Sequence, residues 1–102
     1  MNLAFIRNLT TSGGDNTEAY VTIDADFKLV VIATTKSDGD SGTWSENDMR
    51  ITSGTGTKVR AVIYRGNASS TGAVFENVKY GAKIFCGRSR YGSISAVAMC
   101  FN

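Results

Sequence analysis

Short clusters of glycine, serine, threonine, asparagine and aspartate divide this chain into strand-length pieces, and no stretch has the period of a helix. The clusters occupy residues 11–16, 36–42, 53–57, 66–72 and 87–92. They predict turns, because glycine adopts positive φ and the small polar side chains bond back to their own backbone. Turns at such short intervals are typical of an all-β chain.

The composition indicates the same class. Thr, Val and Ile supply 26 of the 102 residues (11, 8 and 7), whereas Leu supplies 3, and β-branched residues suit a pleated surface better than a helix. A chain of this length buries roughly two-thirds of its unfolded surface. We therefore expect a single-domain antiparallel β-sandwich over residues 1–102, with seven or eight strands. A jelly-roll-like topology is preferred to the immunoglobulin-like alternative, because Trp44 precedes both cysteines.

The expected strands show where apolar side chains alternate. They cover residues 3–9, 18–24, 27–34, 49–52, 58–65, 73–86 and 93–101. In the third of these we expect Phe27, Leu29, Val31 and Ala33 to face the core, although its second face is apolar too. The segment 73–86 keeps one phase across Gly81, which predicts one long bent strand or two strands kinked there.

The last segment, 93–101, is apolar on both faces. A strand at the rim of a monomeric sheet keeps one wet face, so this strand is either central in a sheet or covered by another subunit. We expect it to contact a second copy of the chain, with a trimer favoured and either face outward. The residues of this predicted interface are Ile94, Ala96, Val97, Ala98, Met99 and Phe101.

The residues offer little for catalysis. The absence of histidine removes the commonest general base and metal ligand, and Asp24 and Asp26 are too close in sequence to predict carboxylates opposed across a sugar. We expect no enzyme and no cofactor. Asp38 and Asp40 are a weak metal-binding candidate, because the twelfth position of such a loop is Met49 and not a carboxylate.

Two loops carry candidate binding residues. Trp44 lies in a polar stretch with Glu46, Asn47 and Asp48, which together offer a flat apolar plate beside hydrogen-bond acceptors for a glycan. Packing of Trp44 over one end of the core is the alternative. The second loop, with Arg88, Arg90 and Tyr91, offers donors to an anion or a protein surface. Two arginines are too few for general nucleic-acid binding, so no nucleic-acid partner is expected.

The distribution of charge and the two cysteines bear on the partners, redox state and location expected for this protein. Residues 1–57 carry four basic and eight acidic side chains, whereas residues 58–102 carry seven basic ones and one acidic one. Such a charge asymmetry steers partners. We expect Cys86 and Cys100 to be buried reduced thiols, because a disulfide between them is geometrically unfavourable if residues 87–92 turn a hairpin between their strands. No leader or membrane-spanning run is recognised, which predicts a soluble protein made in the cytoplasm, with virion association left open.

Three function classes follow. The first is a small structural or attachment β-domain that acts as a homo-oligomer, of the kind found at the tips and decorations of phage and virus particles; this is an analogy of architecture. The second is a carbohydrate-binding module centred on Trp44. The third is an antagonist or immunity-type protein that occupies a partner's surface, with charge asymmetry to steer it.

Overall fold

The computed structural model describes residues 2–11, 17–36, 49–64, 69–89 and 94–102. All of the regular elements in these ranges are strands, and they number eight. Their bounds are β1 (Leu3–Thr11), β2 (Thr17–Thr22), β3 (Phe27–Lys36), β4 (Arg50–Ser53), β5 (Thr57–Tyr64), β6 (Ser69–Val78), β7 (Lys83–Ser89) and β8 (Ile94–Phe101).

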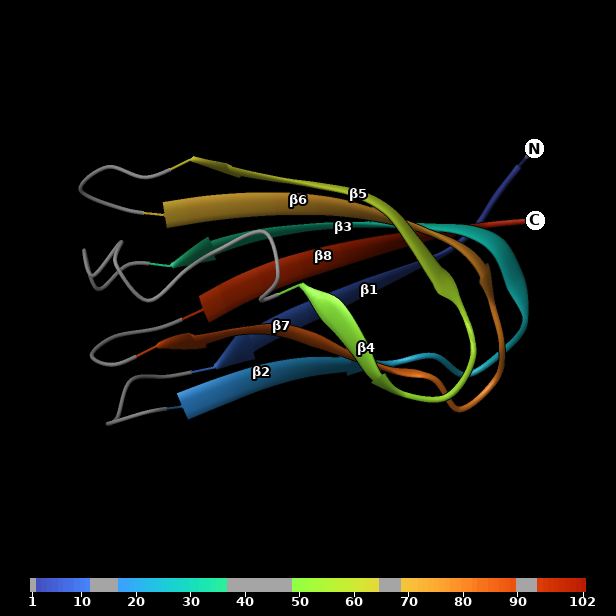
Figure 1. The fold of residues 1–102 in the computed structure, drawn as a ribbon, viewed down its shortest axis with the longest axis horizontal. Coiled ribbons are helices and arrows are strands. Elements are labelled where there is room, and N and C mark those ends of the chain that lie inside the picture. Colours follow the sequence, from blue (N-terminus) through green and yellow to red (C-terminus); the bar gives the residue numbers. More distant parts are fainter. Residues whose placement is uncertain (1, 12–16, 37–48, 65–68, 90–93) are drawn as a thin grey trace.

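Two antiparallel sheets face each other and confirm the expected β-sandwich (Figure 1). The larger sheet has the order β1-β8-β3-β6-β5, and the smaller has the order β2-β7-β4. Strands far apart in sequence pair in a nested series, because β1 pairs with β8, β2 with β7 and β3 with β6. The last strand is therefore central in its sheet, between β1 and β3.

Backbone hydrogen bonds hold together the places where the chain ends or changes sheets. Asn2 and Asn102 exchange two N–H···O bonds of 3.0 and 3.1 Å, so the two ends of the described chain lie side by side (Figure 1). The β2–β3 and β6–β7 connections also meet, since the Ile23 N–H donates to the Ala82 carbonyl at 2.8 Å and the Gly81 N–H to the Ile23 carbonyl at 2.7 Å. Both connections therefore cross between the sheets at the same corner.

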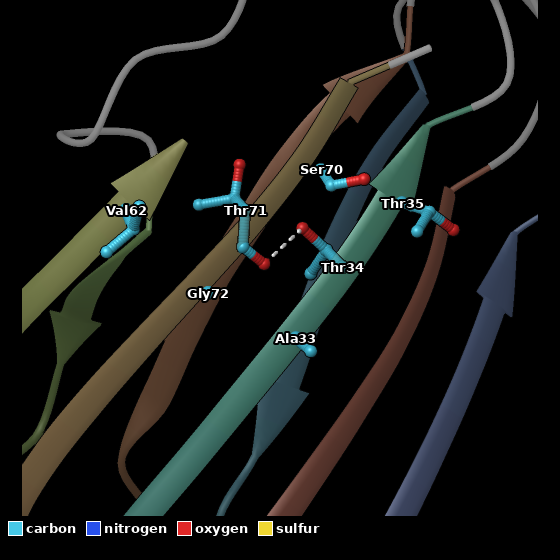
Figure 2. A pocket seen from close by; sticks show the side chains of 7 residues that line it. All are labelled: Ala33, Thr34, Thr35, Val62, Ser70, Thr71 and Gly72. Atoms are coloured by element: carbon cyan, nitrogen blue, oxygen red, sulfur yellow. Dashed lines mark hydrogen bonds between the residues drawn. The ribbon is translucent and has the colours of Figure 1, made fainter. Parts of the chain in front are cut away.

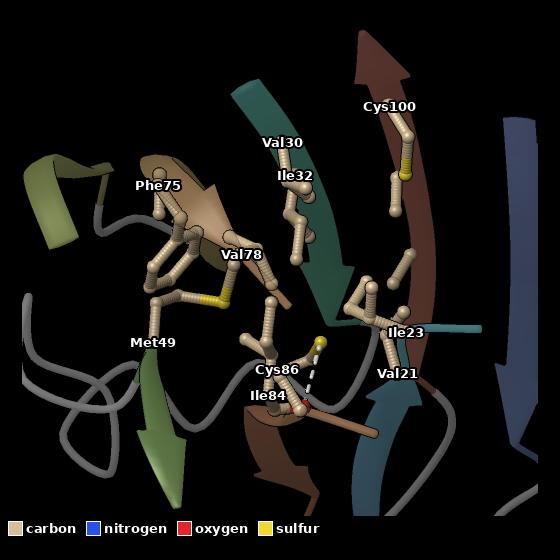
Figure 3. Close-up of a cluster of buried hydrophobic side chains, with 14 of the residues drawn as sticks. Val21, Ile23, Val30, Ile32, Met49, Phe75, Val78, Ile84, Cys86 and Cys100 are labelled. Atoms are coloured by element: carbon tan, nitrogen blue, oxygen red, sulfur yellow. Dashed lines mark hydrogen bonds between the residues drawn. The ribbon is translucent and has the colours of Figure 1, made fainter. Parts of the chain in front are cut away.

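The core fills the space between the sheets (Figure 3). The larger sheet contributes Val30, Ile32 and Phe75, each fully buried, and the smaller sheet contributes Ile84 and Cys86. In residues 18–24, where apolar and polar side chains alternate, the inward side chains are Ala19, Val21 and Ile23. The buried apolar area is the main favourable contribution to folding.

The predicted inward face of residues 27–34 is wrong beyond Phe27. The side chains of Val30, Ile32 and Thr34 face the core, whereas those of Leu29, Val31 and Ala33 lie on the opposite side. Apolar residues occupy both faces of this strand, so periodicity alone does not choose between them.

The expected single phase across residues 73–86 is also wrong, although two strands are indeed present. Phe75 is buried and Val74 faces outward, until Asn77, at φ 52°, shifts the alternation so that Val78 is buried. A turn with Gly81 at φ 87° then leads into β7 in the other sheet. Asparagine is among the few residues that adopt this left-handed conformation readily.

The two cysteine-bearing strands, β7 and β8, do not form a hairpin with each other. β7 belongs to the three-stranded sheet and β8 to the five-stranded sheet, so the connection between them crosses the sandwich. Cys86 and Cys100 are nevertheless buried and not joined by a disulfide, which confirms the prediction of reduced thiols.

Candidate interaction surface

The outer face, meaning the side of the five-stranded sheet turned away from the three-stranded sheet, is largely apolar. Strand pairing aligns its side chains in rows that cross all five strands, and paired residues point to the same side of the sheet. Its apolar residues are Leu3, Ile6, Leu29, Val31, Ala33, Val62, Gly72, Val74, Val97, Met99 and Phe101.

The large side chains of this face are well exposed. Ile6 is 51% exposed, Val62 is 55% and Val97 is 38%. The charged residues on the described part of the face, Arg60 and Glu76, lie on the strands β5 and β6 at one side. An antiparallel sheet with one solvated face normally alternates apolar and polar residues, and a contiguous apolar patch of this kind marks an interaction site.

One end of the outer face is hollowed at Gly72. This hollow has a volume of about 340 Å³ and is lined almost entirely by apolar surface (Figure 2). Its residues come from β3, β5 and β6 and are Ala33, Thr34, Thr35, Val62, Ser70, Thr71 and Gly72. Small side chains make the hollow, because Ala33 and Gly72 stand opposite each other in the register. We call it the Gly72 hollow.

Two threonines lie at the base of the Gly72 hollow. The Thr34 hydroxyl donates to the Thr71 carbonyl at 3.4 Å, and both residues are buried. The Thr71 hydroxyl has no hydrogen-bond partner among the described residues. Such a group costs about 1–3 kcal/mol relative to a satisfied one. Because Thr71 pairs with the inward-facing Thr34, this hydroxyl lies on the core side of the sheet.

The outer side of the three-stranded sheet is different, because cations cover its aromatic rings. The Arg50 guanidinium carbon lies 4.6 Å from the Phe85 ring centroid, and the Lys83 Nζ lies 4.3 Å from that of Tyr20. The two rings pack at 5.3 Å, and Phe85 is buried. Tyr20 also donates its hydroxyl proton to Glu18, which raises the pKa of Tyr20. Charged side chains therefore shield the apolar groups of this sheet, whereas the described residues provide no such shield over the outer face of the larger sheet.

The structure divides the predicted interface residues of the last strand into two sets. Ile94, Ala96 and Ala98 are buried in the chain's own core, which removes them from any contact with a partner. Val97, Met99 and Phe101 lie on the outer face beside residues of β1 and β3. These three are the outward set.

The other predicted sites fall mainly outside the described residues. Trp44, Glu46, Asn47 and Asp48 lie there, and so do Asp38 and Asp40 of the metal candidate and Arg90 and Tyr91 of the basic loop. Arg88 is in β7, paired with Glu18 in the register. Within the described ranges, no three metal-binding side chains gather together, and no helix is long and apolar enough to cross a membrane.

Burial makes the Cys86 thiol inert. Desolvation raises its pKa to about 12, and the thiolate is the reactive form of cysteine. Cys86 is thus a small core residue rather than a nucleophile.

Several residues of the outer face could not be identified from the sequence. Ile6, Val62 and Gly72 come from three strands that are separated along the chain, and only the register brings them onto one surface. The sequence signal that indicates this face is the second apolar side of residues 27–34.

Searches of protein-family models, characterised proteins and solved structures give no match to this chain.

Proposed function

We propose that this protein is a non-enzymatic structural or attachment β-domain that acts as a homo-oligomer, as do the small β-domains at the tips and decorations of phage and virus particles. The observation that carries the proposal is the apolar outer face, which extends over all five strands of the larger sheet and is not covered by any other described strand. Water-exposed apolar area of this extent favours association, because each Å² removed from water contributes about 25 cal/mol.

The strand pairing supports this class. A nested series of pairs is what results when one long hairpin is rolled up on itself, and it favours the jelly-roll alternative over the immunoglobulin-like one. Jelly rolls recur in viral capsid proteins and in lectins. This part of the proposal is an analogy of architecture, since one fold serves many functions.

A second copy is favoured over a different partner because an apolar surface of one chain is automatically matched in polarity by the same surface of another. Isologous contacts of this type are the commonest way in which soluble proteins assemble. The alternatives predicted from sequence, a glycan site at Trp44 and a partner site at the basic loop, depend on residues outside the described ranges.

Light scattering during size-exclusion chromatography tests the proposal. We expect a mass that is a multiple of the 10.9 kDa chain, falling towards one chain on dilution. A mass of one chain at every concentration would contradict it.

A further inference from the structure

The outer face has a symmetry that makes it complementary to itself. β3 is the middle strand of five, with β8 on one side and β6 on the other. One row across these strands places Val97 on β8, Ala33 on β3 and Gly72 on β6. A projecting side chain and a hollow therefore lie at equal distances on opposite sides of the central strand.

We propose that two copies of this chain pack outer face against outer face about a two-fold axis that runs along β3. This inference rests on the proposed function and names its geometry. Rotation about that axis places β8 of each copy over β6 of the other, so Val97 of each copy lies over the Gly72 hollow of its partner. Ala33 of one copy then faces Ala33 of the other on the axis.

The direction of the axis follows from the polarity of the rows. At one end of the face the row on β8, β3 and β6 contains Ser95, Thr35 and Ser70, and at the other end it contains Phe101, Leu29 and Glu76. An axis along β3 sets each row against the same row of the partner. An axis across the strands would set Ser95 against Phe101 and Thr35 against Leu29, which would leave these two hydroxyls buried without partners, at a cost.

The available area fits a pair of this kind. Five strands spaced about 4.8 Å apart give a face about 24 Å wide, and seven residues along a strand give a length of about 24 Å. The face thus offers about 600 Å² per copy and about 1,200 Å² in the pair, the lower end of the range for specific stable interfaces. A sheet face packs against one other sheet face, which favours a pair over the trimer expected from sequence.

The rows also predict where the two sheets approach most closely. Facing pairs in the row of Gly72 are Val against Gly and Ala against Ala, so the sheets can come nearer there than the usual separation of about 10 Å. Gly72 itself has room, because a Cβ built on it would meet only the Ile32 carbonyl oxygen, at 3.9 Å. A larger residue at 72 is therefore tolerated by the single chain and not by the pair.

Single-cysteine variants and a short bifunctional thiol reagent, spanning about 10 Å to match the separation of packed sheets, test the axis. Both native cysteines are buried, so a reagent that links two chains must react with the introduced thiol. Ala33→Cys, on the axis, is expected to give covalent dimers. Val62→Cys lies two strands from the axis, which separates the two copies' thiols by about 19 Å, and is expected to give few. Thr22→Cys, exposed on the other sheet, is the second control.

Three results would overturn the inference. Equal cross-linking of Ala33→Cys and Val62→Cys would place the axis elsewhere. Absence of Ala33→Cys cross-linking in a protein whose mass is a multiple of one chain would reject this geometry and leave the proposed self-association standing. A wild type with the mass of one chain at all concentrations would reject both.

A substitution that fills the Gly72 hollow tests the inference without introduced cysteines. Gly72→Val is expected to fold, as judged by circular dichroism, and to weaken pairing at least tenfold in sedimentation equilibrium. Val59→Thr, which alters a valine 54% exposed at the bulge of β5, is the matched surface control and should leave pairing unchanged. Unchanged pairing of folded Gly72→Val would overturn the inference even if an Ala33→Cys variant failed to fold.

Discussion

A single charge on the outer face should separate the subunits. Met99 lies on β8 with Ile6 and Val31 opposite it on the neighbouring strands, and Val97 and Phe101 before and after it on the same face. All four neighbours are apolar, so a carboxylate introduced by Met99→Glu has no cation beside it among these residues. In the single chain this side chain is partly exposed, and the carboxylate stays in water.

The free-energy cost of the Met99→Glu carboxylate differs greatly between the single chain and the assembly. A change on the solvated side of a strand alters folding by about 1 kcal/mol or less. Burying an unpaired carboxylate in the interface costs several kcal/mol, and a symmetric pair buries two. At about 3 kcal/mol each, the loss is about 6 kcal/mol, or about four factors of ten in the dissociation constant.

Sedimentation equilibrium measures this change directly. Met99→Glu is expected to have the mass of one chain where the wild type is associated, with an unchanged circular dichroism spectrum. Met99→Gln, similar in shape and uncharged, should weaken association less, and lowering the pH through the range where Glu protonates, near 4.3, should partly restore association of Met99→Glu. Thr22→Glu, exposed on the other sheet opposite Lys83, is the matched control. Wild-type association of Met99→Glu would refute the reasoning.

Three further predictions concern the single chain. Thiol reagents at pH 8 should label Cys86 only after unfolding, and labelling of the native protein would contradict its burial. Because the pKa of Cys86 is raised from 9.0 to about 12 in the fold, the unfolded thiol ionises first, so urea midpoints should fall as pH rises from about 9 towards 12; a flat profile in that window would contradict this. In the Met99→Glu background, Gly54→Ala should destabilise by at least about 2 kcal/mol, since φ is 91° and the new Cβ would lie 2.6 Å from the Ala82 Cα. Gly72→Ala should change the free energy of unfolding by no more than about 0.5 kcal/mol. Equal effects of the two substitutions would contradict the difference in room around these two glycines.

The sequence predicts the class of fold well, because turn clusters and β-branched segments are local signals. The alternation in residues 18–24 identifies Ala19, Val21 and Ile23 as core residues, since the intervening side chains of that strand are more polar. The same reasoning fails for residues 27–34, where Val30 and Val31 are equally apolar and only tertiary packing decides which one is buried.

Long-range features of the fold cannot be predicted from the local sequence pattern. The reversal of phase after Phe75 depends on one left-handed residue, Asn77, and assignment of β7 and β8 to different sheets depends on how the chain crosses the sandwich. The outer face shares this origin, because it is assembled from five strands by their register. A strand that is apolar on both sides confuses core prediction and, for the same reason, indicates a surface that has a partner.

The accessibility of the Met99 methyl group tests the central claim most directly. With ¹³C-labelled methionine methyls and a soluble paramagnetic agent, the fully buried Met49 serves as an internal reference that is shielded throughout. The account predicts that the Met99 methyl is broadened by the agent in dilute protein and becomes protected as concentration rises, in step with the increase in mass. A Met99 methyl that stays equally accessible across the whole concentration range would contradict the claim that the outer face is where this protein meets its second copy.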